Sequence, residues 1–384
     1  MAVTQTQTRS RTAAAAAAAV TTTTTTTTNT KPVSHARHKD SMKSTWRNNP
    51  RTSWNIYQKI IDRMGAHHIS LDEPVPKHAK TDKVPHLGQI SQHVWIWFYG
   101  LIPLILHQAF VSLTGWRISR HAAFHFYMAL FNFTIVREVR ILRRLGHKHG
   151  FLDGDVHDRD GVPDRGAGKV VWSLYKTVGA RLAMMVWFSY DPNTPPLAVM
   201  SNWKWLALIP LITGTYQVVL DFWFYVYHRA MHDVPFLWRF HRTHHLTKHP
   251  NPMLSAYADE EQEFFDMVVI PFLTWGTFRA VGIQLGFYEW WMCQQYIVYT
   301  EVWGHSGIRV HLAVPSTLSW LLTPLNMELC VEDHDMHHRK GWRKSQNYGK
   351  QSRVWDRLFG TCGERIESYD ANVDYVNQAY MPIF

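Results

Sequence analysis

The stretch that decides the fold reads Trp205-Leu-Ala-Leu-Ile-Pro-Leu-Ile-Thr-Gly-Thr-Tyr-Gln-Val-Val-Leu-Asp221-Phe-Trp-Phe-Tyr-Val-Tyr-His228-Arg-Ala-Met-His232. From Trp205 to Tyr227 it is almost entirely apolar, and its length suits a helix that spans a bilayer. The two histidines that follow are four positions apart, so on a helix they point the same way, about 40° apart around the axis. Imidazole is a ligand for iron, copper and zinc, so this pair predicts metal binding at one end of the helix.

Two further histidine clusters follow along the chain. They are His241-Arg-Thr-His244-His245 and His334-Asp-Met-His337-His338, and both have the pattern HxxHH. On a helix the three rings of this pattern fall within an arc of roughly 100°, so we expect them to converge on one centre. Chance predicts roughly 0.1 such motifs in a chain with this much histidine, and two are present. Eight clustered histidines exceed what one metal ion normally takes from a protein, so the pattern predicts two metals.

The HxxxH spacing alone is weak evidence, because chance produces it once or twice in this chain. His121-Ala-Ala-Phe-His125 also matches it, within an apolar stretch. We interpret His121 and His125 as a chance match that binds no metal.

Apolar runs predict four or five membrane-embedded helices. The runs are Val94–Leu113, Ala122–Val136, Leu182–Tyr190, Trp205–Tyr227, Phe264–Val281 and Leu285–Val302. Fully buried helices of a soluble core would give the same pattern. Eighteen tryptophans favour a membrane, since this residue gathers at the membrane interface. The net charge is +10, and because Lys and Arg flank the apolar runs we expect membrane-side loops and no nucleic-acid-binding patch.

Composition divides the chain into four parts. Residues 1–50 contain the tracts Ala13–Ala19 and Thr21–Thr28, which predict a disordered tail. An organellar transit peptide is the alternative, because no acidic residue precedes Asp40. We expect residues 51–200 to form an N-terminal membrane and linker region, 201–364 a catalytic domain and 365–384 a C-terminal tail. The three cysteines suit neither a disulfide framework nor a zinc ribbon.

Residues Trp203 to Glu364 resemble the fatty acid hydroxylase and sterol desaturase superfamily of membrane di-iron enzymes. The resemblance rests on Asp221 to His232, on the two HxxHH motifs, on Glu301-Val-Trp-Gly-His305-Ser-Gly, on Asn347-Tyr-Gly-Lys and on Trp355-Asp-Arg-Leu-Phe-Gly360-Thr. It implies an all-α, multi-pass protein of the endoplasmic reticulum, with a helical membrane base and a cytosolic histidine-rich cap. Where many sterol-oxidising relatives have a His-Pro pair, this chain reads Tyr257-Ala-Asp-Glu-Glu, which leaves the substrate subfamily open.

The resemblance also implies a ligand set for two irons. The ligands would be His228, His232, His241, His244, His245, His305, His334, His337 and His338. Asp221 lies seven residues before His228 and is expected to accept a hydrogen bond from a ligand imidazole. Glu301 lies one helical turn before His305, and three roles stay open for it: metal ligand, acceptor beside a ligand, or buried paired glutamate.

The function that these features predict is O₂-dependent hydroxylation of a lipid C–H bond, with desaturation as the alternative. By the resemblance, electrons come from NAD(P)H through cytochrome b5 and its reductase. A histidine-rich membrane metal transporter would place its histidines within the spans, whereas here the boxes lie among Arg, Lys and Asp. A structural metal module would need one closed four-ligand site. The substrate stays open among sterols, fatty acyl chains, sphingoid bases and related metabolites.

Overall fold

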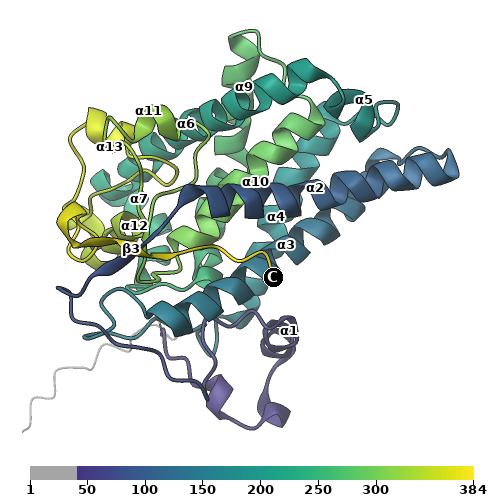
Figure 1. Ribbon diagram of the computed structural model, residues 1–384. Coiled ribbons are helices and arrows are strands. Elements are labelled where there is room, and N and C mark those ends of the chain that lie inside the picture. Colours follow the sequence, from purple (N-terminus) through teal and green to yellow (C-terminus); the bar gives the residue numbers. More distant parts are fainter. Residues whose placement is uncertain (1–40) are drawn as a thin grey trace, which may run out of the picture. The chain divides into compact units, whose positions relative to one another are not determined.

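Figure 1 shows the fold of the protein in a computed structural model, which describes residues 41–384. The Ala and Thr tracts of the expected disordered tail lie outside the described residues. Residues 41–50, which we assigned to that tail, instead form ordered structure. The 3-10 helix Trp46–Asn48 buries Trp46, and the backbone N–H groups of Thr45 and Trp46 donate to Asp164 at 2.6 and 2.8 Å.

Helices account for most of the fold, as expected. They are α1 (Ile56–Met64), α2 (Gln89–Thr114), α3 (Arg120–His149), α4 (Ala167–Ser189), α5 (Pro196–Met200), α6 (Trp203–Asp233), α7 (Pro235–His241), α8 (Glu260–Phe264), α9 (Ile270–Ala280), α10 (Phe287–Gly304), α11 (Ser319–Leu322), α12 (Val331–Lys340) and α13 (Val354–Leu358).

The apolar stretch from Trp205 to Tyr227 and the two histidines after it lie in α6. The helix begins after Asn202, whose side chain accepts a hydrogen bond from the backbone N–H of Lys204. It ends at Asp233, two residues before Pro235, because a proline disfavours helical backbone in the residue that precedes it. His228 and His232 therefore lie in the last turns of α6.

The apolar runs Phe264–Val281 and Leu285–Val302 form two successive helices that both pack against α6. The first combines α8, a π-helical turn over Phe265–Val269 and α9. Gly282 has a φ of 83°, a left-handed backbone that glycine adopts without strain, and it allows the chain to turn before α10.

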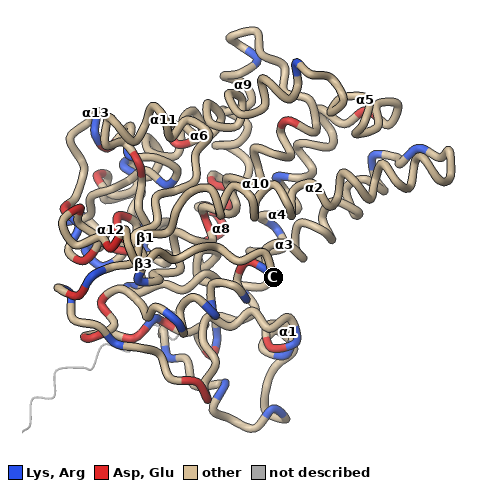
Figure 2. Tube along the Cα trace, viewed as in Figure 1, with Lys and Arg blue, Asp and Glu red and all other residues tan. Residues whose placement is uncertain are grey.

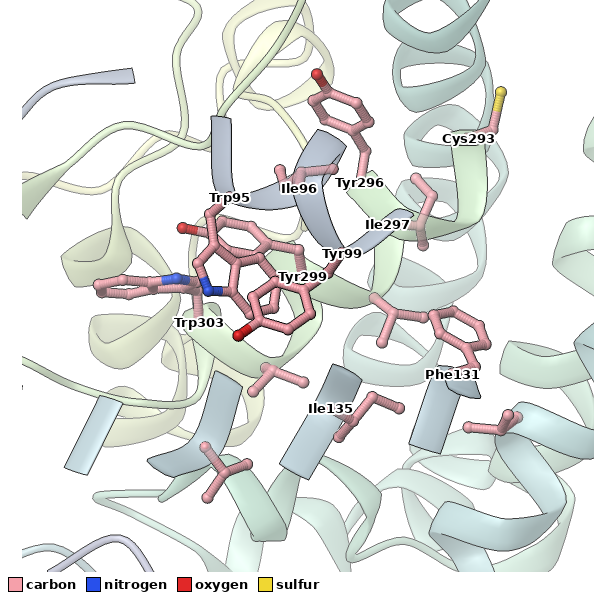
Figure 3. Packing of buried hydrophobic residues seen from close by; sticks show 14 of the residues in the cluster. Trp95, Ile96, Tyr99, Phe131, Ile135, Cys293, Tyr296, Ile297, Tyr299 and Trp303 are labelled. Atoms are coloured by element: carbon pink, nitrogen blue, oxygen red, sulfur yellow. The ribbon is translucent and has the colours of Figure 1, made fainter. Parts of the chain in front are cut away.

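Helix α10 lies at the centre of the core, and nearly all of its side chains are buried. Its aromatic residues pack against α2 and α3, as Figure 3 shows. Tyr299 contacts Trp95 with ring centroids 5.4 Å apart, and Trp291 contacts Phe131 at 5.2 Å. This packing fixes α10, whose C-terminal end leads into His305.

A small parallel sheet departs from the all-α expectation. It has the strand order β2–β1–β3, with β1 at Val84–Leu87, β2 at His311–Leu312 and β3 at Val373–Ala379. His86 pairs with His311 and Val84 with Val373. Residues 365–384, which we expected to be a tail, thus return to pair with a strand that precedes α2.

Two described helices, α2 and α6, are long and apolar enough to cross a membrane. The expected number of four or five is not reached by this criterion. Helix α3 has sufficient length, but Arg137, Arg140, Arg143 and Arg144 lie in its second half. Charged residues gather around α12, the strands and α1, and few lie along α2 (Figure 2).

Candidate metal centre

All nine histidines of the expected ligand set come together in two groups. One group contains His228, His232, His241, His245 and His337, and the other contains His244, His305, His334 and His338. Within each group the nitrogen atoms lie within 4.8 Å of one another, and every one of the nine side chains is buried. His121 and His125 lie near the start of α3 and belong to neither group.

Each HxxHH box is divided between the two groups, so its three rings do not all point to the same group. In the second box His241 ends α7, whereas His244 and His245 lie in a separate 3-10 helix, so the box is not on one helix. In the third box, on α12, His337 belongs to the five-histidine group and its two neighbours in the box to the other. The adjacent histidines of each box thus face different groups.

Backbone carbonyls orient most of these rings through their Nδ1 atoms. The pairs are His228 with Tyr348 O at 2.7 Å, His232 with Trp342 O at 3.0 Å, His337 with Gln346 O at 2.8 Å, His338 with Thr247 O at 2.9 Å and His305 with Glu301 O at 2.8 Å. A carbonyl oxygen only accepts hydrogen bonds, so each of these Nδ1 atoms carries the proton. The Nε2 atoms of the same rings therefore carry lone pairs.

These Nε2 lone pairs face other nitrogens at short distance. His228 Nε2 lies 2.9 Å from His241 Nε2, and the ring of His241 is oriented by Gln262 Oε1 at 2.9 Å from its Nδ1. His305 Nε2 lies 3.1 Å from His334 Nε2. His232 Nε2 and His338 Nε2 are buried and have no hydrogen-bond partner within residues 41–384.

Facing lone pairs repel each other, and buried unpaired acceptors lower stability, unless a cation lies among them. Both groups therefore fit a metal ion, and neutral imidazole is the form that binds one.

Burial keeps the rings neutral. It is the largest cause that holds the pKa of His244 and of His338 well below the usual histidine value, and neighbouring histidines lower both further. The same causes lower the pKa of His245 and of His334. These rings are neutral at physiological pH and can bind metal without first losing a proton.

Asp221 contacts a loop, although we expected it to contact a ligand imidazole. Its carboxylate accepts hydrogen bonds from the backbone N–H groups of Lys350, Gln351 and Ser352 at 2.7, 2.9 and 3.1 Å, and from the Ser352 hydroxyl at 2.7 Å. This loop directly follows Tyr348, whose carbonyl orients His228. Asp221 therefore supports the metal centre indirectly, because it holds the loop next to the Tyr348 carbonyl that orients His228.

Glu301 pairs with Lys350, whose Nζ lies 2.8 Å from Glu301 Oε1. The same carboxylate oxygen is 3.7 Å from His305 Nδ1, which donates its hydrogen bond to the Glu301 backbone carbonyl. Glu301 thus lies beside the four-histidine group, and its side chain is paired with a cation.

The segment from Trp342 to Tyr348 is the functional element that the sequence argument missed, since three of its carbonyls orient histidines. Asp356 holds this segment by accepting from the backbone N–H groups of Tyr348 and Gly349 at 2.9 and 2.8 Å. Asn347 has a φ of 57°, a conformation that asparagine tolerates better than most residues. The only sequence signal for this segment was its family motif Asn347-Tyr-Gly-Lys. A carbonyl that orients a histidine leaves no signal of its own, because every residue type has a backbone carbonyl.

Comparison with known proteins places the chain in a family. The fatty acid hydroxylase profile matches residues 213–361, a range that includes all nine histidines. The fatty acid hydroxylase vlmA of Lecanicillium sp is 45% identical over 310 residues, which cover 78% of this chain and 84% of that protein. This chain belongs to the fatty acid hydroxylase family. The resemblance noted in the sequence is thereby confirmed, and the protein is an oxidoreductase that uses molecular oxygen.

More distant similarity extends to two further enzymes. The alkylglycerol monooxygenase of Xenopus tropicalis is 28% identical over 211 residues, or 53% of this chain and 40% of that protein. The cholesterol 25-hydroxylase-like protein of Danio rerio is 27% identical over 183 residues, or 43% of this chain and 65% of that protein. No solved structure matches the chain.

Proposed function

We propose that this fatty acid hydroxylase family member is a membrane-bound di-iron enzyme that hydroxylates a C–H bond of a lipid. The observation that carries the proposal is the convergence of histidine Nε2 lone pairs in two separate buried groups. The nine histidines would hold two irons, five rings around one and four around the other. The names of the relatives include two hydroxylases and a monooxygenase, which supports a lipid substrate and favours hydroxylation over desaturation.

The overall reaction converts R–H, O₂, two electrons and two protons into R–OH and water. Iron bound at this centre would supply the oxidising power that an unactivated C–H bond requires. The chain contributes positioning: the carbonyls of Trp342, Gln346 and Tyr348 keep three rings in place, and burial of the centre excludes water.

The proposal places the histidine centre just outside a membrane. His228 and His232 lie at the C-terminal end of α6, one of the two helices that could cross a bilayer. Basic residues surround the boxes, and such residues gather on the cytosolic side of membrane proteins. They are Arg229, Arg239, Arg242, Lys248, Arg339, Lys340, Arg343 and Lys344. The proposed location is the endoplasmic reticulum, with the centre on the cytosolic side.

The same basic surface suits an acidic electron donor, because complementary charge accelerates the encounter between redox partners. We assign this role to a cytochrome b5-type protein with its NAD(P)H-dependent reductase.

Metal analysis tests the proposal directly. Protein purified under anaerobic conditions is expected to contain about two irons per chain, because two histidine groups are present. Membranes supplied with NADH and ¹⁸O₂ should yield a lipid alcohol with one ¹⁸O atom. A single tightly bound zinc without iron, or a lipid product whose oxygen derives from water, would contradict the proposed function.

A further inference from the structure

A cavity lies among α3, α4, α6, the π-helical turn, α9 and α10. Most of its wall is apolar, with Ile135 from α3, Leu174 and Val178 from α4, and Ile297 from α10. Such a wall suits the hydrocarbon chain of a lipid.

The polar part of the wall lies next to the histidines. Asp266 accepts from Gln262 Nε2 at 3.2 Å, and Gln262 Oε1 orients His241. Glu301 and Lys350 also line the cavity. Glu301 lies one helical turn before His305, and Lys350 lies two residues after Tyr348. The polar part of the cavity wall is therefore connected to the metal centre through Gln262, Glu301 and Lys350.

The charges along this polar wall balance. Lys350 pairs with Glu301 at 2.8 Å. Arg181 lies beside Asp266 and donates to its backbone carbonyl at 3.0 Å. Glu263, the remaining charged residue of the wall, pairs with Lys176 at 2.6 Å. The formal charges of these residues sum to zero, so a ligand carboxylate or ammonium would add a net charge to a desolvated site, which is unfavourable.

Three buried polar atoms of this wall have no hydrogen-bond partner among the described residues. Asp266 Oδ1 and Gln351 Oε1 are acceptors, and Arg181 Nε is a donor. Buried polar groups in native proteins are almost always paired, so these atoms indicate a ligand group that both donates and accepts hydrogen bonds. A hydroxyl or an amide meets this requirement, whereas an alkane does not.

We infer that this cavity binds a neutral lipid by a hydroxyl or amide head group, and that the oxidised carbon lies within a few bonds of that head. The inference rests on the proposed oxygenase function and adds the substrate class. Arg181, Asp266 and Gln351 bind the head group, and the hydrocarbon chain extends along α3 and α4.

Binding of four hexadecyl ligands tests the head-group preference. The iron-loaded full-length protein in detergent micelles is titrated with hexadecan-1-ol, hexadecanamide, hexadecanoate or hexadecane, and quenching of tryptophan fluorescence reports affinity. The alcohol and the amide should bind about tenfold more tightly than the other two, as loss of a hydrogen bond to a charged group predicts. Equal affinities, or tightest binding of hexadecanoate, would overturn the inference.

Two variants locate the preference. Asp266→Asn and Arg181→Met should each weaken hexadecan-1-ol binding by about tenfold and leave hexadecane binding unchanged. Arg144→Met, at an exposed position of α3, is the matched control and should change neither. If both variants bind alcohol like the wild type, or lose alcohol and alkane equally while they remain folded, the assignment of these residues is wrong. If a variant does not fold, the titration of the wild-type protein with the four hexadecyl ligands still tests the head-group preference.

The position of oxidation separates this inference from the proposed function. Membranes with the wild-type enzyme, NADH and ¹⁸O₂ are given hexadecan-1-ol, and mass spectrometry locates the new hydroxyl. Oxidation within a few carbons of the head supports head-first binding, and oxidation at the far end of the chain overturns it while the oxygenase function stands. Retention of the binding preference without any O₂-dependent product would contradict the oxygenase function and still support the head-group site.

Discussion

Backbone carbonyls set the proton position in five of the nine histidine rings, and this detail gives the cluster its chemistry. Once Nδ1 donates to a carbonyl, Nε2 can only accept, and these five buried rings then present their lone pairs to the two groups. A similar number of surface histidines would each satisfy both nitrogens with water. At the scale of the residue, burial together with tautomer is what distinguishes a metal centre from a histidine-rich surface.

The two groups should lose metal separately. His228→Ala removes a ring from the five-histidine group and His244→Ala one from the four-histidine group, so each should lower the iron content from about two per chain to about one and abolish turnover. Elemental analysis of the purified variants measures this. His121→Ala, outside both groups, is the control and should retain iron and activity. Equal loss of iron in His121→Ala would show that the centre lies elsewhere.

Two stacked tryptophans connect the surface to the centre. Trp342 is 37% exposed, its ring lies 5.7 Å from that of Trp238 at an interplanar angle of 15°, and Trp238 lies 5.2 Å from His232. Arg343 lies over Trp342, 4.7 Å from its ring centroid. With the proposed electron donor bound at the basic surface, this aromatic contact would provide a short route for electrons.

Trp342→Leu should therefore slow reduction of the iron by the electron donor without lowering the iron content. The carbonyl that orients His232 belongs to the backbone and remains in the variant. Anaerobic stopped-flow measurement of iron reduction by reduced cytochrome b5 measures the rate, and Trp320→Leu, at an exposed tryptophan of α11, is the matched control. Identical rates in the wild type and both variants would exclude this route.

At the scale of the element, α12 is held by its acidic residues Glu332 and Asp335. Glu332 accepts from the backbone N–H groups of Ile366, Glu367 and Ser368 at 2.9, 2.8 and 2.7 Å. Asp335 pairs with Arg159 from a loop before α4 and with Arg339 one turn later. The acidic side chains of α12 therefore hold the surrounding loops in place, and the histidine side chains of α12 belong to the two histidine groups.

Asp221 has the same kind of role for the loop that follows α12. Asp221→Asn replaces an acceptor by an amide N–H that faces backbone donors, so the free energy of unfolding should fall by roughly 1.5–3 kcal/mol, the range for one hydrogen bond to a charged group. Because the loop carries the Tyr348 carbonyl, iron should also bind more weakly. Thermal unfolding and iron titration in detergent measure the two effects. Unchanged iron affinity in a destabilised Asp221→Asn would show that the loop does not support the centre.

At the scale of the whole molecule, the proposed membrane-bound enzyme would carry all three boxes on one membrane face. The histidines of the two groups come from α6, α7, the 3-10 helix His244–Leu246 and α12, with His305 directly after α10. The chain between the second and third boxes runs through α9, turns near Gly282 and returns through α10. The turn is expected on the opposite side of the membrane.

Cysteine labelling in sealed microsomes tests this topology. Single cysteines at the exposed positions Lys248, Lys344 and Gln284 are introduced with Cys362→Ser, since the other two native cysteines are buried. Lys248→Cys and Lys344→Cys should react with a membrane-impermeant thiol reagent from the cytosolic side. Gln284→Cys should react only after the microsomes are permeabilised with detergent. Reaction of the first two from opposite sides would rule out a shared centre.

Much of this architecture follows from local pattern. The capped apolar stretch of α6, the HxxxH pair at its end and the composition of both HxxHH boxes predicted helices, ligands and family. The number of spans was less predictable, because the buried helix α10 and the membrane candidate α2 are both apolar, and sequence alone does not reveal whether protein or lipid covers a side chain.

The sequence by itself predicted the side chains of the proposed centre, eight histidines from their spacing and His305 from the family resemblance. Only the tertiary structure decided how they divide into groups of five and four, since adjacent histidines of one box point to different partners. It also decided which backbone carbonyls orient the rings, and that Asp221 holds a loop rather than a histidine. Every residue has a carbonyl, and only folding brings one from position 348 to a ring at position 228.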